Sequence, residues 1–157
     1  MELHNLEYDS VILHCDQALE RYPNQALLYF YNGVALYSKK EFEPAIRFLS
    51  YGRKYVEDPN LLGFFYAQLG DAHNALEQHT QSDEAYEKAL ELNPNNEHVL
   101  NNYSYFLCLR NQELSKAQEM AKKLIQKYPE NATYLDTYGW VLYTMKQNEG
   151  HCPCLEF

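Results

Sequence analysis

Few residues of this chain combine side-chain type and spacing in a way that could support chemistry. The densest group is His151-Cys152-Pro153-Cys154, because imidazole and thiolate are ligands for zinc or copper. A closed zinc site usually takes four ligands, and no second Cys or His group is near in the sequence. We therefore expect a terminal tail here, with no metal site and no cofactor.

The remaining ionisable residues do not form a catalytic set. His73 and His79 are six positions apart, which does not place them on one face of a helix. The carboxylates around Glu84 and Glu87 are expected on an exposed helix face. The sequence also has no Gly-rich phosphate loop, no Gly-x-Ser-x-Gly and no His-Glu-x-x-His motif. These observations favour a protein that is not an enzyme.

Composition narrows the class of partner. The chain has 157 residues and a formal net charge of −9, which disfavours a protein that binds nucleic-acid phosphates. No apolar run reaches the roughly 18 residues that a membrane span needs. We expect neither nucleic-acid binding nor membrane insertion, while the cellular compartment stays open.

Four prolines divide the chain at regular intervals. Pro23, Pro59, Pro94 and Pro129 follow helix-like stretches and lie 35 or 36 residues apart. A period in this range is typical of stacked helical repeats. Proline lacks an N–H group and disfavours helix in the residue before it, so each proline is expected to separate two helices.

Each interval contains two amphipathic stretches. In residues 63–96, Tyr66, Leu69, Gly70 and His73 share one helical face, and a second helix follows a polar break. The same reading along the chain predicts eight helices. Their expected ranges are 7–21, 25–39, 42–57, 61–76, 79–92, 96–110, 114–127 and 131–146.

The residues of the 63–96 interval resemble the tetratricopeptide repeat. Tyr66-x-x-Leu69-Gly70-x-x-His73, followed by Ser82, Tyr86, Ala89 and Pro94, is similar to the family pattern Trp-x-x-Leu-Gly-x-x-Tyr, Ala-x-x-x-Phe, Pro. The intervals on either side match it in register. Small residues at Gly33, Gly70, Ser104 and Gly139 are expected where neighbouring helices approach closely.

The resemblance implies an all-α fold, a right-handed superhelix of antiparallel helix pairs. We expect an array over residues 1–146 and an irregular tail over 147–157. The array would contain three full repeats with a half repeat at each end. The full repeats are expected at 26–61, 63–96 and 97–131, and the half repeats at 7–25 and 132–146.

The resemblance also implies that the first helix of each repeat lines a concave groove that binds a protein partner. The residues at the groove-facing positions are mostly aromatic or apolar, with a few amides and carboxylates. They are Phe30, Val34, Tyr37, Phe64, Asp71, Asn74, His98, Asn101, Tyr105, Asp136, Trp140 and Tyr143. These positions have no Lys or Arg, so the clamp by which some family members grip a C-terminal carboxylate is not implied. An extended peptide or a helix of a partner fits such a groove better.

Three functions remain open at this point. The leading one is a scaffold for protein–protein interaction. The alternative interpretation of the same aromatic residues is that they only pack in the core. The others are a structural spacer or assembly segment of a larger protein, and a regulatory domain of a multidomain enzyme. In the last helix, Leu135, Gly139 and Leu142 are expected to pack against the preceding repeat, with Tyr134, Val141 and Met145 on the other side. The sequence therefore also predicts a symmetric homodimer through the exposed repeat ends, with these last three side chains buried between copies.

Overall fold

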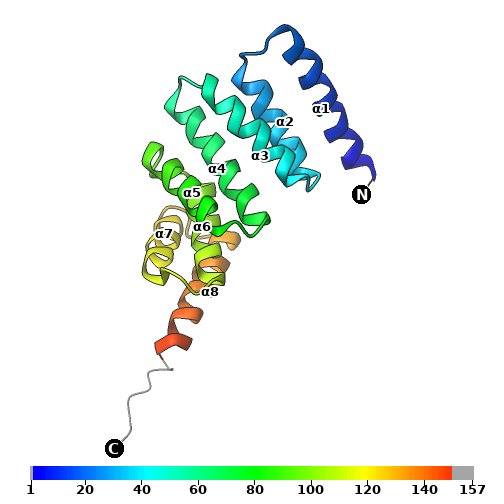
Figure 1. Ribbon diagram of the computed structural model, residues 1–157. Coiled ribbons are helices and arrows are strands. Elements are labelled where there is room, and N and C mark those ends of the chain that lie inside the picture. The colour runs from blue at the N-terminus through cyan, green and yellow to red at the C-terminus, as the bar shows by residue number, and fades with distance from the viewer. Residues whose placement is uncertain (1, 150–157) are drawn as a thin grey trace, which may run out of the picture. The chain divides into compact units, whose positions relative to one another are not determined.

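The computed structural model describes residues 2–149, and this part of the chain is entirely helical (Figure 1). It contains eight α-helices and a short 3₁₀ turn, so the prediction of an all-α fold is confirmed. The helices are α1 (Glu2–Arg21), α2 (Ala26–Ser38), α3 (Phe42–Gly52), α4 (Pro59–Ala75), α5 (His79–Leu92), α6 (Glu97–Leu109), α7 (Leu114–Lys127) and α8 (Ala132–Glu149).

The chain forms two compact units, residues 1–94 and 95–157. In the first unit, each of α1 to α4 packs against the next helix along the chain. A cluster that includes Tyr29, Leu49, Phe65 and Leu69 forms its core. In the second unit, α6 and α8 both pack against α7 and against each other. Tyr103, Leu107, Leu124 and Val141 are among its buried side chains.

The prolines end or begin helices as the sequence predicts, with one difference of detail. Pro23, Pro94 and Pro129 lie in turns between helices, whereas Pro59 is the first residue of α4. Proline suits this position because the first N–H groups of a helix have no partner within the helix. Asp58 caps the same end, since its carboxylate accepts hydrogen bonds from the backbone N–H groups of Asn60 and Leu61. The preceding helix, expected to reach residue 57, ends at Gly52 and continues as the 3₁₀ turn Arg53–Tyr55.

The turns inside three helix pairs share one backbone arrangement. Lys40, Glu77 and Asn111 have φ of 64°, 57° and 56°. After each of them the next N–H donates to a carbonyl five residues back, for example Gln78 N to His73 O at 2.9 Å. This bond satisfies a carbonyl that would otherwise have no partner at the helix end. Lysine and glutamate are unusual in this conformation, so the residue types at these positions do not predict the shared turn.

The small residue in the middle of the first helix of a pair allows the second helix to approach. A Cβ atom built at Gly70 would lie 2.6 Å from Cδ1 of Tyr86 in α5, and one at Gly33 would lie 2.6 Å from Cγ of Leu49 in α3. The Ser82 hydroxyl also donates a hydrogen bond to the Gly70 carbonyl at 2.9 Å. Close approach therefore explains why glycine is used at these two helical positions.

The last helix buries the opposite face from the one expected. Val141 is 0% exposed, whereas Leu135 and Leu142 are exposed and a Cβ at Gly139 would meet nothing within 4 Å. The expected strip of Tyr134, Val141 and Met145 is therefore wrong as an exposed surface. Val141 follows Gly139 by two residues, as the buried Ala35 and Ala72 follow Gly33 and Gly70.

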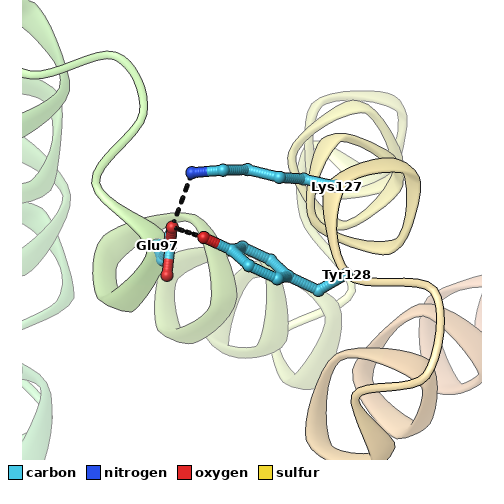
Figure 2. Close-up of polar contacts among 3 residues, drawn as sticks. All are labelled: Glu97, Lys127 and Tyr128. Atoms are coloured by element: carbon cyan, nitrogen blue, oxygen red, sulfur yellow. Dashed lines mark hydrogen bonds and ion pairs between the residues drawn. The ribbon is translucent and has the colours of Figure 1, made fainter.

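A polar contact ties the beginning of α6 to the end of α7 in the second unit. Glu97 accepts a hydrogen bond from Lys127 Nζ at 2.8 Å and another from the Tyr128 hydroxyl (Figure 2). The bond from the Lys127 ammonium and then that from Tyr128 hold the pKa of Glu97 below its ordinary value. The same contact raises the pKa of Lys127. The contacts of Glu97 with Lys127 and Tyr128 help to hold α6, the helix that carries Tyr105, against the end of α7.

Candidate functional site

The residues predicted to bind a partner are divided between the two units. Phe30, Val34, Tyr37, Phe64, Asp71 and Asn74 belong to α2 and α4 of the first unit. Phe64 is exposed, while Phe30 is half-buried with its ring 5.2 Å from that of Phe65 in the core. Val34, Tyr37 and Asn74 are also half-buried. In this unit, Phe64 is therefore the predicted apolar side chain that is most open to a ligand.

The prediction that Asp71 faces the partner is wrong. Asp71 is 3% exposed and accepts a hydrogen bond of 2.5 Å from the hydroxyl of the buried Tyr86. Burial, and then the Asp71 carboxylate, raise the pKa of Tyr86 well above its ordinary value. Asp71 thus belongs to the contact between α4 and α5. The periodicity of α4 alone gives no sign that a tyrosine of α5 reaches it.

The second unit brings four of the predicted residues around one cavity. The cavity has a volume of about 540 Å³ and lies between α6 and α8. Tyr105 lines it from α6, and Asp136, Trp140 and Tyr143 line it from α8. The three aromatic side chains remain open to solvent, with 38% of Tyr105, 45% of Trp140 and 55% of Tyr143 exposed. The rings of Trp140 and Tyr143 stack at a centroid distance of 5.7 Å.

Two polar contacts hold α8 against α6, and a third joins α8 to the turn after α6; together they position the cavity. The Thr137 hydroxyl donates to Asn101 Oδ1 at 3.0 Å, and the thiol of the buried Cys108 lies 3.2 Å from the Thr144 hydroxyl oxygen. Asn148 Nδ2 donates to Asn111 Oδ1 at 2.6 Å. Because these contacts occur at several points along α8, they set the distance between the helix face that carries Tyr105 and the one that carries Trp140.

Two further predicted residues on α6 contact other side chains of this chain. Asn101 accepts the bond from Thr137 and is half-buried, so this amide helps to hold the helices together. His98 is exposed, and its Nε2 lies 3.3 Å from the side-chain nitrogen of Asn102. Neither residue lines the cavity, which leaves the aromatic residues and Asp136 as the predicted groups that do.

Two further residues line the cavity, although the sequence predicts a different contact for them. Leu135 and Gly139 form part of its wall, although both were expected to pack against the preceding repeat. The equivalence of Gly139 with Gly33 and Gly70 could have revealed this, because those glycines face the second helix of their own pair. In α8 no described helix covers that face, and it adds an apolar wall to the aromatic one.

A second exposed aromatic surface lies on the first unit and was not predicted. Tyr29, Phe48, Tyr51 and Arg47 surround a cavity of about 310 Å³ on α2 and α3. The ring of Tyr29 lies 5.2 Å from that of Tyr51, and the Tyr29 hydroxyl donates to the Pro23 carbonyl. Tyr29 is buried, so much of this group belongs to the packing between the two helices.

The described residues contain no group of three or more His, Cys, Asp or Glu that is arranged to hold a metal ion. The cluster His151-Cys152-Pro153-Cys154 lies outside the described residues. Within the described part, no helix has the length and apolar character of a membrane span.

Comparison with known proteins gives a consistent family. The tetratricopeptide-repeat family matches residues 65–96 and, through a second profile, residues 85–119. A TPR repeat-containing protein of Pseudomonas aeruginosa, PA4667, is 31% identical over 137 residues, which is 86% of this chain. The chain spans only 22% of the length of that relative.

A solved structure shows the same fold. YrrB, described as a TPR protein with an unusual peptide-binding site, has a TM-score of 0.72 and 20% sequence identity. The match covers 93% of this chain and 72% of that one. Proteins built from such repeats are generally scaffolds for protein interaction. The repeat pattern, the helix pairs and these matches together show that the chain belongs to the tetratricopeptide-repeat family.

Proposed function

We propose that the chain binds a peptide or helix of a partner protein through the cavity between α6 and α8. The observation that carries this proposal is the group of three exposed aromatic side chains, Tyr105, Trp140 and Tyr143, around one cavity. Aromatic residues supply much of the energy at protein interfaces because they bury a large area with few rotatable bonds. Phe64 on α4 is a second candidate contact, in the first unit.

The rigidity of the two helices supports the same proposal. A side chain that is already fixed loses little entropy when a partner binds. Trp140 stacks on Tyr143, and the contacts of Asn101 and Cys108 with α8 hold the helices that carry the aromatic residues. The cavity is therefore largely formed before a partner arrives.

Two other functions remain as alternatives, because the relative from Pseudomonas aeruginosa is much longer than this chain. The chain could serve as a spacer or assembly segment, or as a regulatory part of a protein that has further domains. The exposed face of α8 with Leu135, Gly139 and Leu142 would then contact another segment or a second copy. A homodimer remains a prediction. Because Val141 is buried within the chain, the face with Leu135, Gly139 and Leu142 would form the contact between copies.

A selection with a displayed library of random peptides tests the proposal. Peptides selected on the intact chain are measured against a Tyr105→Ala/Trp140→Ala variant. We expect affinity to fall at least about 30-fold, which corresponds to the loss of one hot-spot side chain of about 2 kcal/mol. Circular dichroism should show unchanged helix content, since both side chains are exposed.

The matched control is Tyr22→Ala/Tyr31→Ala, which removes two exposed aromatic side chains from the first unit. This control should bind the same peptides with the affinity of the unaltered chain. If peptides are selected but bind the Tyr105→Ala/Trp140→Ala variant equally well, the partner site lies elsewhere on the array.

A further inference from the structure

The cavity between α6 and α8 combines aromatic faces with a single negative charge. Asp136 is the one lining residue that is charged at neutral pH, and all lining residues belong to the described part of the chain. Its carboxylate is exposed, and no lysine or arginine of the described chain pairs with it. Tyr105, Trp140 and Tyr143 line the same cavity with three ring systems.

We infer that this cavity selects a cationic side chain, an arginine or lysine, of the bound peptide; the inference rests on the proposed function. The face of an aromatic ring carries partial negative charge and attracts a cation that lies over it, and tryptophan does so most strongly. A carboxylate in the same cavity also favours a cation, because the two can form an ion pair. An acidic or purely aliphatic side chain would leave Asp136 without a partner when the cavity is covered.

The residues that line the cavity agree with such an occupant. Lysine and arginine carry a long aliphatic stem below the charged group, and such a stem can lie on apolar surface while the head reaches a polar partner. Leu135 and Gly139 form the apolar wall of this cavity, and Asp136 follows Leu135 directly. The stem can therefore contact Leu135 and Gly139 while the head reaches the carboxylate and the rings.

The chain itself shows cations placed over tyrosine rings. Lys116 Nζ lies 5.0 Å from the ring centroid of Tyr103, and Arg53 and Lys88 lie 5.3 Å and 5.6 Å from that of Tyr66. The rings that line the cavity carry no such cation among the described contacts. The net charge of −9 also favours the approach of a basic peptide over an acidic one.

The test uses peptides that were selected on the intact chain and depend on Tyr105 and Trp140. Each arginine or lysine of such a peptide is replaced in turn by norleucine, which keeps the stem and removes the charge. We expect one replacement to weaken binding about tenfold, as a cation–π contact and an ion pair together provide. Trp140 is the only tryptophan of the chain, so its fluorescence reports each titration directly.

Asp136→Asn supplies the second arm. The asparagine variant should lose affinity for the cationic peptide and keep its affinity for the norleucine peptide, so the two changes are coupled in a double-mutant cycle. Exchange of arginine and lysine in the peptide shows which cation the cavity prefers. As a control, Asp83→Asn on α5 should leave both affinities unchanged.

The outcomes separate this inference from the proposed function. If the peptides need Tyr105 and Trp140 but tolerate norleucine at every basic position, or bind Asp136→Asn equally well, the inference of a cationic side chain is overturned and the proposed function stands. If no selected peptide depends on Tyr105 and Trp140, the proposed function fails and this inference fails with it.

Discussion

At the scale of single residues, glycine has two different environments in equivalent positions. Gly70 and Gly139 both lie in the middle of the first helix of a pair, but only Gly70 has a covering side chain, Tyr86. Leucine at Gly70 must displace the Tyr86 ring, whereas leucine at Gly139 enters open space. The two positions therefore form a matched pair for testing the repeat register.

We expect Gly70→Leu to destabilise the protein by about 1–3 kcal/mol or more, because overpacking forces the helices apart. Gly139→Leu should leave stability unchanged or raise it slightly, since leucine is a better helix former than glycine. Chemical denaturation of the two variants provides the comparison. Equal losses of stability would mean that Gly139 is covered as Gly70 is, which would contradict the open space found beside Gly139.

The contrast between Asp71 and Trp140 shows where sequence reasoning succeeds at this scale. Both were placed on the partner-binding face from their position in the repeat. Trp140 lines the cavity with Tyr105, but Asp71 is buried under Tyr86. The repeat position gives the direction of a side chain from its own helix. It does not say whether a long side chain from the next helix will cover it.

At the scale of helices, the residues at the helix ends and the spacing of apolar residues predict where each helix lies. The four prolines and the 3.6-residue periodicity predicted all eight helices, because both act within a few residues of the chain. The packed face of α8 was predicted incorrectly. Both faces of this helix are apolar, with Val141 on one and Leu135 and Leu142 on the other, so periodicity could not choose between them.

The contact between the beginning of α6 and the end of α7 makes a prediction about pH. The pKa of Glu97 is lower in the folded protein than its ordinary value. Its contribution to stability is therefore fully present above the ordinary pKa of glutamate, near 4.5, and is lost as the pH falls through the folded value. Glu97→Gln removes the charge and with it this contribution.

We expect Glu97→Gln to be less stable than the unaltered protein at pH 7, and the difference to shrink as the pH is lowered from 6 toward 3. Urea denaturation across this range gives both free energies of unfolding. Glu119→Gln, which alters an exposed carboxylate on α7, is the control and should show a smaller difference at pH 7. A difference for Glu97→Gln that stays constant with pH would contradict the role of the contact.

At the scale of the whole molecule, each repeat gains its stability mainly from its neighbours. This explains why a chain that spans 22% of its relative's length still forms packed helix pairs. The two compact units, 1–94 and 95–157, divide the molecule between α5 and α6. The binding function proposed here requires only the second unit, because Tyr105, Asp136, Trp140 and Tyr143 all belong to it.

The central claim is that a partner peptide contacts the cavity between α6 and α8. Photo-crosslinking tests it most directly: a selected peptide with a diazirine residue is irradiated with the intact chain, and the modified residues are identified by mass spectrometry. We predict that the adducts fall on α6 and α8, around Tyr105, Asp136 and Tyr143, and that unlabelled peptide competes them away. Competed adducts confined to α1 to α5 or to α7 would contradict the claim.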